Sequence, residues 1–154
     1  MLVIILLVAL LAVLAVAGFV TWVRRASACG RTIDVPAGEP IRTFPGDTMC
    51  RSVVTSGSFA RLEAHDWGIR IRGVAVTRWI VPTWEARYEE LAQAELVASK
   101  SRIAVWLRLR GESGGMGFLG TRSRDILQLL EEHQVQVSHA PAQARRLADL
   151  YGPR

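Results

Sequence analysis

The side chains that could support acid–base or metal chemistry are few in this chain of 154 residues, and they lie far apart. The candidates are two cysteines and three histidines: Cys29, Cys50, His65, His133 and His139. Zinc sites draw their ligands from short, characteristic spacings, which these residues do not show. His65 is followed by Asp66, but no motif connects a nucleophile to this pair. We therefore expect no metal, no cofactor and no catalytic site, and hence no enzyme.

Anion binding is the other chemistry that the composition suggests. Residues 111–117 are rich in glycine but lack the GK[ST] ending of a phosphate-binding loop, which favours a plain hairpin loop. The chain has 19 basic and 14 acidic residues, and nearly all of the basic ones are arginine. Because guanidinium groups bind phosphate in a bidentate fork, this excess indicates either anionic ligands or only a compositional bias. No basic run exceeds two residues, so we expect no nucleic-acid binding.

Four arginines stand at alternate positions in two segments with strand character: Arg70, Arg72, Arg108 and Arg110. If the two strands were neighbours, these side chains would form a basic stripe, worth about 1 kcal/mol per residue at an anionic lipid surface. The alternative is a solvated face, partly paired with Glu63, Glu95 or Glu112. Trp67, in the turn before Arg70, is a candidate for insertion at a membrane interface.

Residues 2–23 carry no charge, which predicts a membrane-spanning helix ahead of the segments that hold these side chains. At about 1.5 Å per residue they reach roughly 33 Å, enough to cross a hydrocarbon core of about 30 Å. Trp22, Arg24 and Arg25 occupy the flank, as is typical of a membrane-spanning helix. We predict an uncleaved anchor, because the apolar run exceeds the about 7–15 residues of a signal peptide. The alternative is a lipoprotein cleavage site at residues 26–29.

The charges around the span predict its orientation. Arg24, Arg25 and Arg31 follow the apolar segment, so the positive-inside rule places the soluble part in the cytoplasm and the N-terminus outside the inner membrane. In that reducing compartment Cys29 and Cys50 would be thiols, and Cys29 would be close enough to the membrane for palmitoylation. With the reverse topology the two cysteines could pair.

Residues 24–48 are predicted to be a linker, because prolines and glycines recur in them: Pro36, Pro40, Pro45, Gly30, Gly38 and Gly46. Such residues disfavour a long helix or a central strand. The linker would leave the next domain tethered with some freedom to move. Its apolar residues could still pack on that domain: Ile33, Val35, Ile41 and Phe44.

Residues 49–136 show the alternation of short strands and then the period of a helix. Residues 58–65 and 69–72 predict a hairpin, and further strands are expected at 74–81, 92–98, 103–110 and 116–119. Residues 84–91 fit a helical turn or a strand. Trp79, Trp84 and Trp106 are expected in the core or at sheet edges. A helix is predicted from an apolar stripe: Ile126, Leu127, Leu129 and Leu130. Pro141 would open a short helix at 142–151 within the tail 137–154.

Three segments resemble a pleckstrin-homology-like (PH-like) domain, as found in small actinobacterial-type membrane proteins: residues 59–73, 87–97 (RYEELAQAELV) and 117–135 (GFLGTRSRDILQLLEEHQV). The resemblance covers about residues 52–136 and implies two orthogonal antiparallel sheets that form a partly open barrel, capped by a C-terminal helix. It also implies a binding module. Phosphoinositide-binding members carry Lys and Arg between the first two strands, whereas residues 65–68 read HDWG here.

The sequence therefore predicts an α+β protein: a transmembrane helix at 1–23, a linker at 24–48, a PH-like domain at 49–136 and a tail at 137–154. We expect a cytoplasmic adaptor that binds an unidentified protein at the inner membrane. The alternative is a sensor of anionic lipid that uses the arginine stripe.

Overall fold

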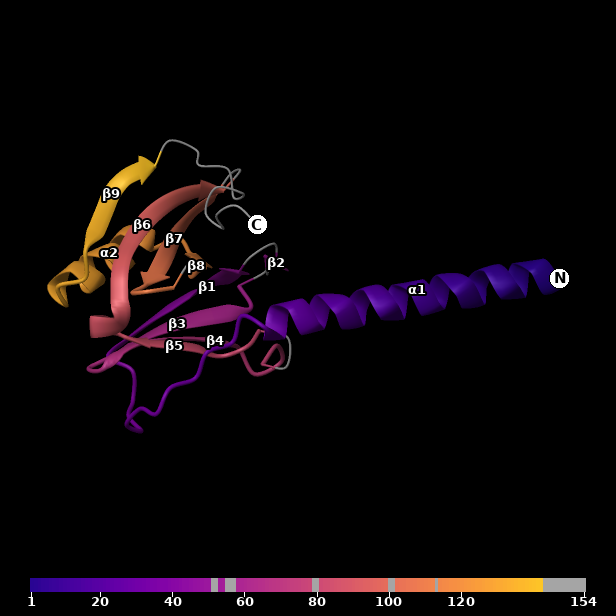
Figure 1. Ribbon diagram of the computed structural model, residues 1–154, viewed down its shortest axis with the longest axis horizontal. Coiled ribbons are helices and arrows are strands. Elements are labelled where there is room, and N and C mark those ends of the chain that lie inside the picture. Colours follow the sequence, from indigo (N-terminus) through magenta and orange to yellow (C-terminus); the bar gives the residue numbers. More distant parts are fainter. Residues whose placement is uncertain (51–52, 55–57, 79–80, 100–101, 113, 143–154) are drawn as a thin grey trace.

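The N-terminal helix α1 (Leu2–Ser27) extends away from the rest of the molecule in the computed structural model (Figure 1). The structure describes residues 1–50, 53–54, 58–78, 81–99, 102–112 and 114–142. None of the apolar window Val3–Arg24 is buried, so this helix is long and apolar enough to cross a membrane and does not serve as a core helix of the domain. It continues beyond residue 23, because no glycine or proline lies between Val23 and Gly30.

The remainder is an α+β domain built on one open, mixed β-sheet. Its strands are β1 (Arg42–Cys50), β2 (Val53–Val54), β3 (Ala60–His65), β4 (Gly68–Gly73), β5 (Trp84–Arg87), β6 (Leu91–Ser99), β7 (Arg102–Leu109), β8 (Gly115–Leu119) and β9 (Val137–Ala142). They follow the path β5-β4-β3-β1-β8-β7-β6-β9, with β2 paired to β1. All pairs are antiparallel except β6 with β9. The predicted hairpin at 58–72 is confirmed as β3 and β4.

Strand β1 joins the two halves of the sheet and corrects the expected linker. Its first half pairs with β3, from Arg42 to Gly46, and its second half pairs with β8, from Asp47 to Met49. Proline has no backbone N–H to donate, which normally excludes it from a central strand. Pro45 is tolerated because this half of β1 pairs only with β3, and the pairing with β8 begins at Asp47. A Cβ on Gly46 would approach the Phe118 ring to 2.6 Å, so glycine allows the two halves to meet closely.

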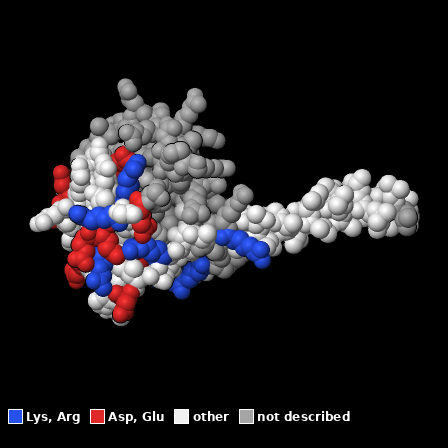
Figure 2. All heavy atoms as spheres, viewed as in Figure 1, with Lys and Arg blue, Asp and Glu red and all other residues white. Residues whose placement is uncertain are grey.

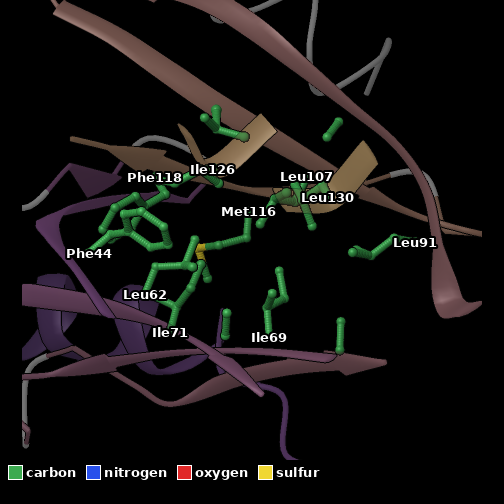
Figure 3. Packing of buried hydrophobic residues seen from close by; sticks show 14 of the residues in the cluster. Phe44, Leu62, Ile69, Ile71, Leu91, Leu107, Met116, Phe118, Ile126 and Leu130 are labelled. Atoms are coloured by element: carbon green, nitrogen blue, oxygen red, sulfur yellow. The ribbon is translucent and has the colours of Figure 1, made fainter. Parts of the chain in front are cut away.

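The hydrophobic core lies between these two halves of the sheet. Figure 3 shows Leu62 and Ile71 from β3 and β4 facing Met116 across the interior. The helix α2 (Ser123–Glu132) covers the open side, and its predicted stripe is confirmed: Ile126, Leu127, Leu129 and Leu130 are all buried. Trp84 and Trp106 are also buried, as predicted, whereas Trp79 lies outside the described residues.

The structure changes two local predictions and resolves a third. Residues 74–78 form a turn rather than a strand, because Thr77 donates its backbone N–H to the Val74 carbonyl at 2.8 Å. Residues 84–91 combine both expected forms, since β5 is followed by the 3₁₀ turn η1 (Tyr88–Glu90). Residues 137–142 form strand β9, not the opening of a helix, because they pair with β6 at the sheet edge, where Pro141 is tolerated. The rest of the expected tail helix lies outside the described residues.

Candidate functional site

The predicted arginines of β4 are ion-paired. Arg70 Nε lies 2.6 Å from Glu85 Oε1 on β5, and Arg72 Nη2 lies 2.6 Å from Glu63 Oε1 on β3. Both carboxylates are buried, with residue exposures of 5% for Glu85 and 2% for Glu63. Buried carboxylates require such partners, so these guanidinium groups complete an internal network rather than await a ligand.

The predicted stripe is not continuous. Strands β4 and β7 are separated by β3, β1 and β8 in the sheet, so their arginines do not form one row. Arg108 Nη2 lies 2.9 Å from Glu95 Oε1, an acidic partner that the sequence suggested, and Arg110 is exposed beyond the end of β7. Figure 2 shows acidic and basic side chains interleaved on the visible face of the domain.

A cluster of His65, Trp67 and Glu63 lies on the outer side of β3 and its turn. The His65 ring is buried and stacks on Trp67 at 5.0 Å between centroids, with the Arg70 guanidinium 5.6 Å from the Trp67 ring. His65 Nε2 is 3.8 Å from Glu63 Oε2, too far for a hydrogen bond. Burial, and secondarily the Arg70 charge, lower the pKa of His65, so the ring is neutral near pH 7.

The position of Trp67 in the sheet argues against its expected insertion at a membrane interface. The turn between β3 and β4 lies at the end of the sheet opposite to the point where α1 joins (Figure 1). Trp67 therefore cannot reach the bilayer that α1 would span. Its position is instead part of the surface that faces away from the helix.

Tyr88 is a residue that the sequence did not single out. Its hydroxyl donates to the His65 carbonyl at 3.0 Å, and its ring stacks on His133 at 3.8 Å between centroids. Burial raises the pKa of Tyr88 to about 12. The phenol thus remains a neutral hydrogen-bond donor that ties the end of α2 to the sheet.

The junction between helix and domain is covalent. Cys29 and Cys50 form a disulfide, with 6.2 Å between their Cα atoms. The expectation of two free thiols is therefore wrong, because the close approach of β1 to the end of α1 brings the two side chains together. With its sulfur in this bond, Cys29 is not available for palmitoylation or for lipoprotein-type modification.

Arg31 forms a second set of contacts between the end of α1 and the sheet. Its backbone bridges to Trp84 at the edge of β5, and its Nη2 lies 2.7 Å from Glu90 Oε1. The hydrogen bond to Glu90 raises the pKa of Arg31, and the same bond lowers the pKa of Glu90. Ile33 donates its backbone N–H to Glu85 Oε2 at 3.0 Å, so this segment lies on the sheet and not in solvent.

The residues that the sequence predicts to flank a membrane lie at the end of α1. Trp22 is partly buried and stacks on Phe19 at 6.2 Å between centroids, and Arg24 is exposed. The side chain of Arg25 lies outside the described part. Figure 2 shows that basic atoms gather where the helix meets the domain and that the rest of the helix is uncharged.

An open depression of about 470 Å³ lies at the start of β1 and of α2. Its lining combines two cationic, one anionic, two uncharged polar side chains and one aromatic ring: Arg42, Arg122, Asp125, Thr43, Gln128 and Phe44. Arg122 Nε lies 2.6 Å from Asp125 Oδ2, and its guanidinium lies 5.6 Å from the centroid of Phe44. Because β1 runs from this depression to Cys50, the depression lies at the end of β1 that is far from α1.

Comparison with known proteins adds no assignment. No protein-family model matches the sequence, and no curated protein matches it either. Among the described residues, no group of three or more His, Cys, Asp or Glu side chains is placed to hold a metal ion.

Proposed function

We propose that this protein is a single-pass membrane protein that holds a binding domain in a fixed orientation at the bilayer. The observation that carries this proposal is the junction of α1 with the sheet. An apolar helix with no buried residue in its window leads into a disulfide, and Arg31 then pairs with Glu90. A flexible tether would need neither bond, whereas a domain that presents one surface to a partner benefits from both.

The domain lies on the oxidising side of the membrane in this proposal, not in the cytoplasm. A disulfide in a small domain is typical of an extracytoplasmic compartment, because cytosolic thiols are kept reduced. The charge argument for a cytoplasmic domain is weaker than the sequence suggests, since the Arg31 charge is paired with Glu90. Arg24 and Arg25 still favour the opposite orientation, so topology is the feature to test first.

A PH-like architecture is part of the same proposal. The meander of β1, β3, β4 and β5 is followed by that of β6, β7 and β8, and α2 then covers the open side of the core. This order supports a partly open barrel with a capping helix. Strand β9 would be an addition to that plan at the outer edge of β6.

The binding surface in this proposal is the depression at Arg42 and Arg122, and its ligand is an acidic segment of a partner protein. Its two guanidinium groups face one carboxylate, so the lining carries a net positive charge. The Arg122 guanidinium lies over the buried Phe44 ring, which holds it at the surface where it can pair with a carboxylate. The depression opens away from the bilayer, where a second protein has access.

Photocrosslinking in native membranes tests the binding surface. The full chain would carry a photoreactive amino acid at Thr43, in the depression, or at the exposed Thr32, beside β5, as the matched control. We expect a discrete adduct with a second protein from position 43 and not from position 32. Absence of an adduct at position 43, or equal adducts at both positions, would contradict the assignment of this surface.

Thiol labelling tests the topology. In intact cells the two cysteines should resist a maleimide reagent until a reductant is added, because they are paired. A C-terminal reporter that is active only outside the cytoplasm should be active. Cysteines that react without reductant, together with a silent reporter, would restore the cytoplasmic orientation.

A further inference from the structure

The turn between β4 and β5 lies at the same end of the sheet as the base of α1. Strand β1 ends at Cys50, which is bonded to Cys29 just beyond the helix. Strand β3 runs antiparallel to β1, so its first residue is at this end, and β4 finishes beside it at Gly73. Figure 1 shows the segment after β4 beside the base of α1.

Two large apolar side chains are exposed at this end. Val76, at the tip of the turn, is 74% exposed, and Phe59, just before β3, is 41% exposed. Arg78 follows on the same turn and is also exposed. We call residues 74–78 together with Phe59 the juxtamembrane turn. An apolar tip flanked by a guanidinium is the composition that suits the boundary between lipid headgroups and acyl chains.

Hydrogen bonds within the turn account for the exposure of Val76. The Thr77 hydroxyl, on a nearly buried residue, donates to the Phe59 carbonyl at 2.8 Å, and Val74 donates its backbone N–H to the same carbonyl at 2.9 Å. A Cβ on Gly73 would lie 2.8 Å from the Thr77 carbonyl oxygen, so the chain turns back on itself tightly. These bonds hold the turn closed and direct its tip outward.

The distance from the bilayer is short. The apolar window ends at Arg24 and α1 ends at Ser27, a separation of only about 4.5 Å along the helix axis. The headgroup layer on each side of the hydrocarbon core is roughly 5–8 Å thick. Because the disulfide joins the end of β1 to the end of α1, a side chain that projects from this end would be within reach of the headgroup layer of a bilayer that α1 spans.

We propose that the juxtamembrane turn inserts Val76 and Phe59 into the interface of the bilayer that α1 spans, as a second point of membrane contact. This inference rests on the proposed membrane-spanning role of α1. It differs from the arginine stripe in both residues and location, and its partner is the lipid surface itself. The turn and the disulfide together would set the tilt of the domain and so the direction in which the depression faces.

Depth-dependent fluorescence quenching tests this contact in the full chain. Single Val76→Cys, Ile41→Cys and Val13→Cys variants would be labelled with the environment-sensitive dye NBD and reconstituted into phosphatidylcholine–phosphatidylglycerol vesicles that contain nitroxide lipids. Ile41 is the matched control, because it is 56% exposed but lies at the far end of β1. Val13 is the control for the spanning helix. A mass corresponding to one label verifies that Cys29 and Cys50 remain paired.

We expect shallow nitroxides to quench the dye at position 76 several-fold more than at position 41, and deep nitroxides to quench position 13. Quenching at 13 with equal, weak quenching at 76 and 41 would overturn the second contact while leaving the anchor intact. No quenching at position 13 would instead overturn the membrane-spanning role of α1, and with it this inference.

Discussion

Replacing Arg72 by methionine would leave a buried carboxylate without its cation while preserving most of the side-chain volume. Glu63 is 2% exposed, and its Oε1 accepts a hydrogen bond from Arg72 Nε at 2.8 Å and pairs with Nη2 at 2.6 Å. Its Oε2 has no hydrogen-bond partner among the described residues, and the nearby His65 is neutral. Arg72 is thus the group that stabilises the charge of Glu63.

The expected magnitude follows from the burial of the two partners. Removing one partner of a buried ion pair costs about 3–5 kcal/mol, and hydrogen bonds to charged groups contribute about 1.5–3 kcal/mol each. The Arg72 side chain is 36% exposed, so water reduces the penalty. We expect Arg72→Met to lower the free energy of unfolding by about 2–4 kcal/mol. The double variant Glu63→Gln/Arg72→Met should recover most of this loss, because it leaves no unpaired buried charge.

Urea unfolding of the full chain in detergent micelles, followed by tryptophan fluorescence, measures this effect. The matched control is Arg61→Met, because Arg61 is exposed and lies directly opposite Arg72 on the neighbouring strand. It should change the free energy of unfolding by less than about 0.5 kcal/mol. Equal losses for the two single variants, or a double variant as unstable as Arg72→Met, would refute the assignment of a buried pair.

Three further outcomes are expected. Replacing Cys29 and Cys50 by serine should lower the free energy of unfolding by about 3 kcal/mol, since the bond closes a loop across a sequence separation of 21; an unchanged urea midpoint would contradict this. Leu130→Ala, at a fully buried site under the sheet, should cost about 2–5 kcal/mol in the same assay, and a smaller loss would show that α2 packs loosely. The pKa of His65 is lower in the folded chain than its unfolded value of about 6.5, so the unfolded chain binds more protons and stability should fall as pH drops below about 6.5. His65→Gln should flatten this acid dependence, and identical pH profiles of melting temperature would disprove it.

The proposed contact between domain and membrane would give the two proposals a common geometry. The disulfide and the Arg31–Glu90 pair fix the base of the domain to α1, and the juxtamembrane turn lies at that same base. The depression at Arg42 lies at the opposite end of β1. In the proposed arrangement, one end of the domain lies at the bilayer and a cationic surface lies at the other end, which suits the capture of a partner at a set height above the membrane.

Local pattern alone determined several parts of this protein. The uncharged run at the N-terminus dictates a long apolar helix, whatever it later contacts. The hairpin of β3 and β4 follows from alternating side chains around a turn, and the stripe of Leu and Ile residues specifies the buried face of α2. Each of these signals acts between residues close in sequence, where the period of the backbone decides which side chains share a face.

Only the tertiary structure decided the features on which the proposed function rests. Pro45 disfavours a central strand locally, but β1 is central because its proline half has a single hydrogen-bonded neighbour. The arginines alternate as a stripe in sequence, yet the strand order separates them and gives each of Arg70, Arg72 and Arg108 a carboxylate. Cys29 and Cys50 pair because the fold brings the end of β1 to the end of α1. Such contacts join residues distant in the chain, and their free energy depends on spatial approach and burial, which no local spacing encodes.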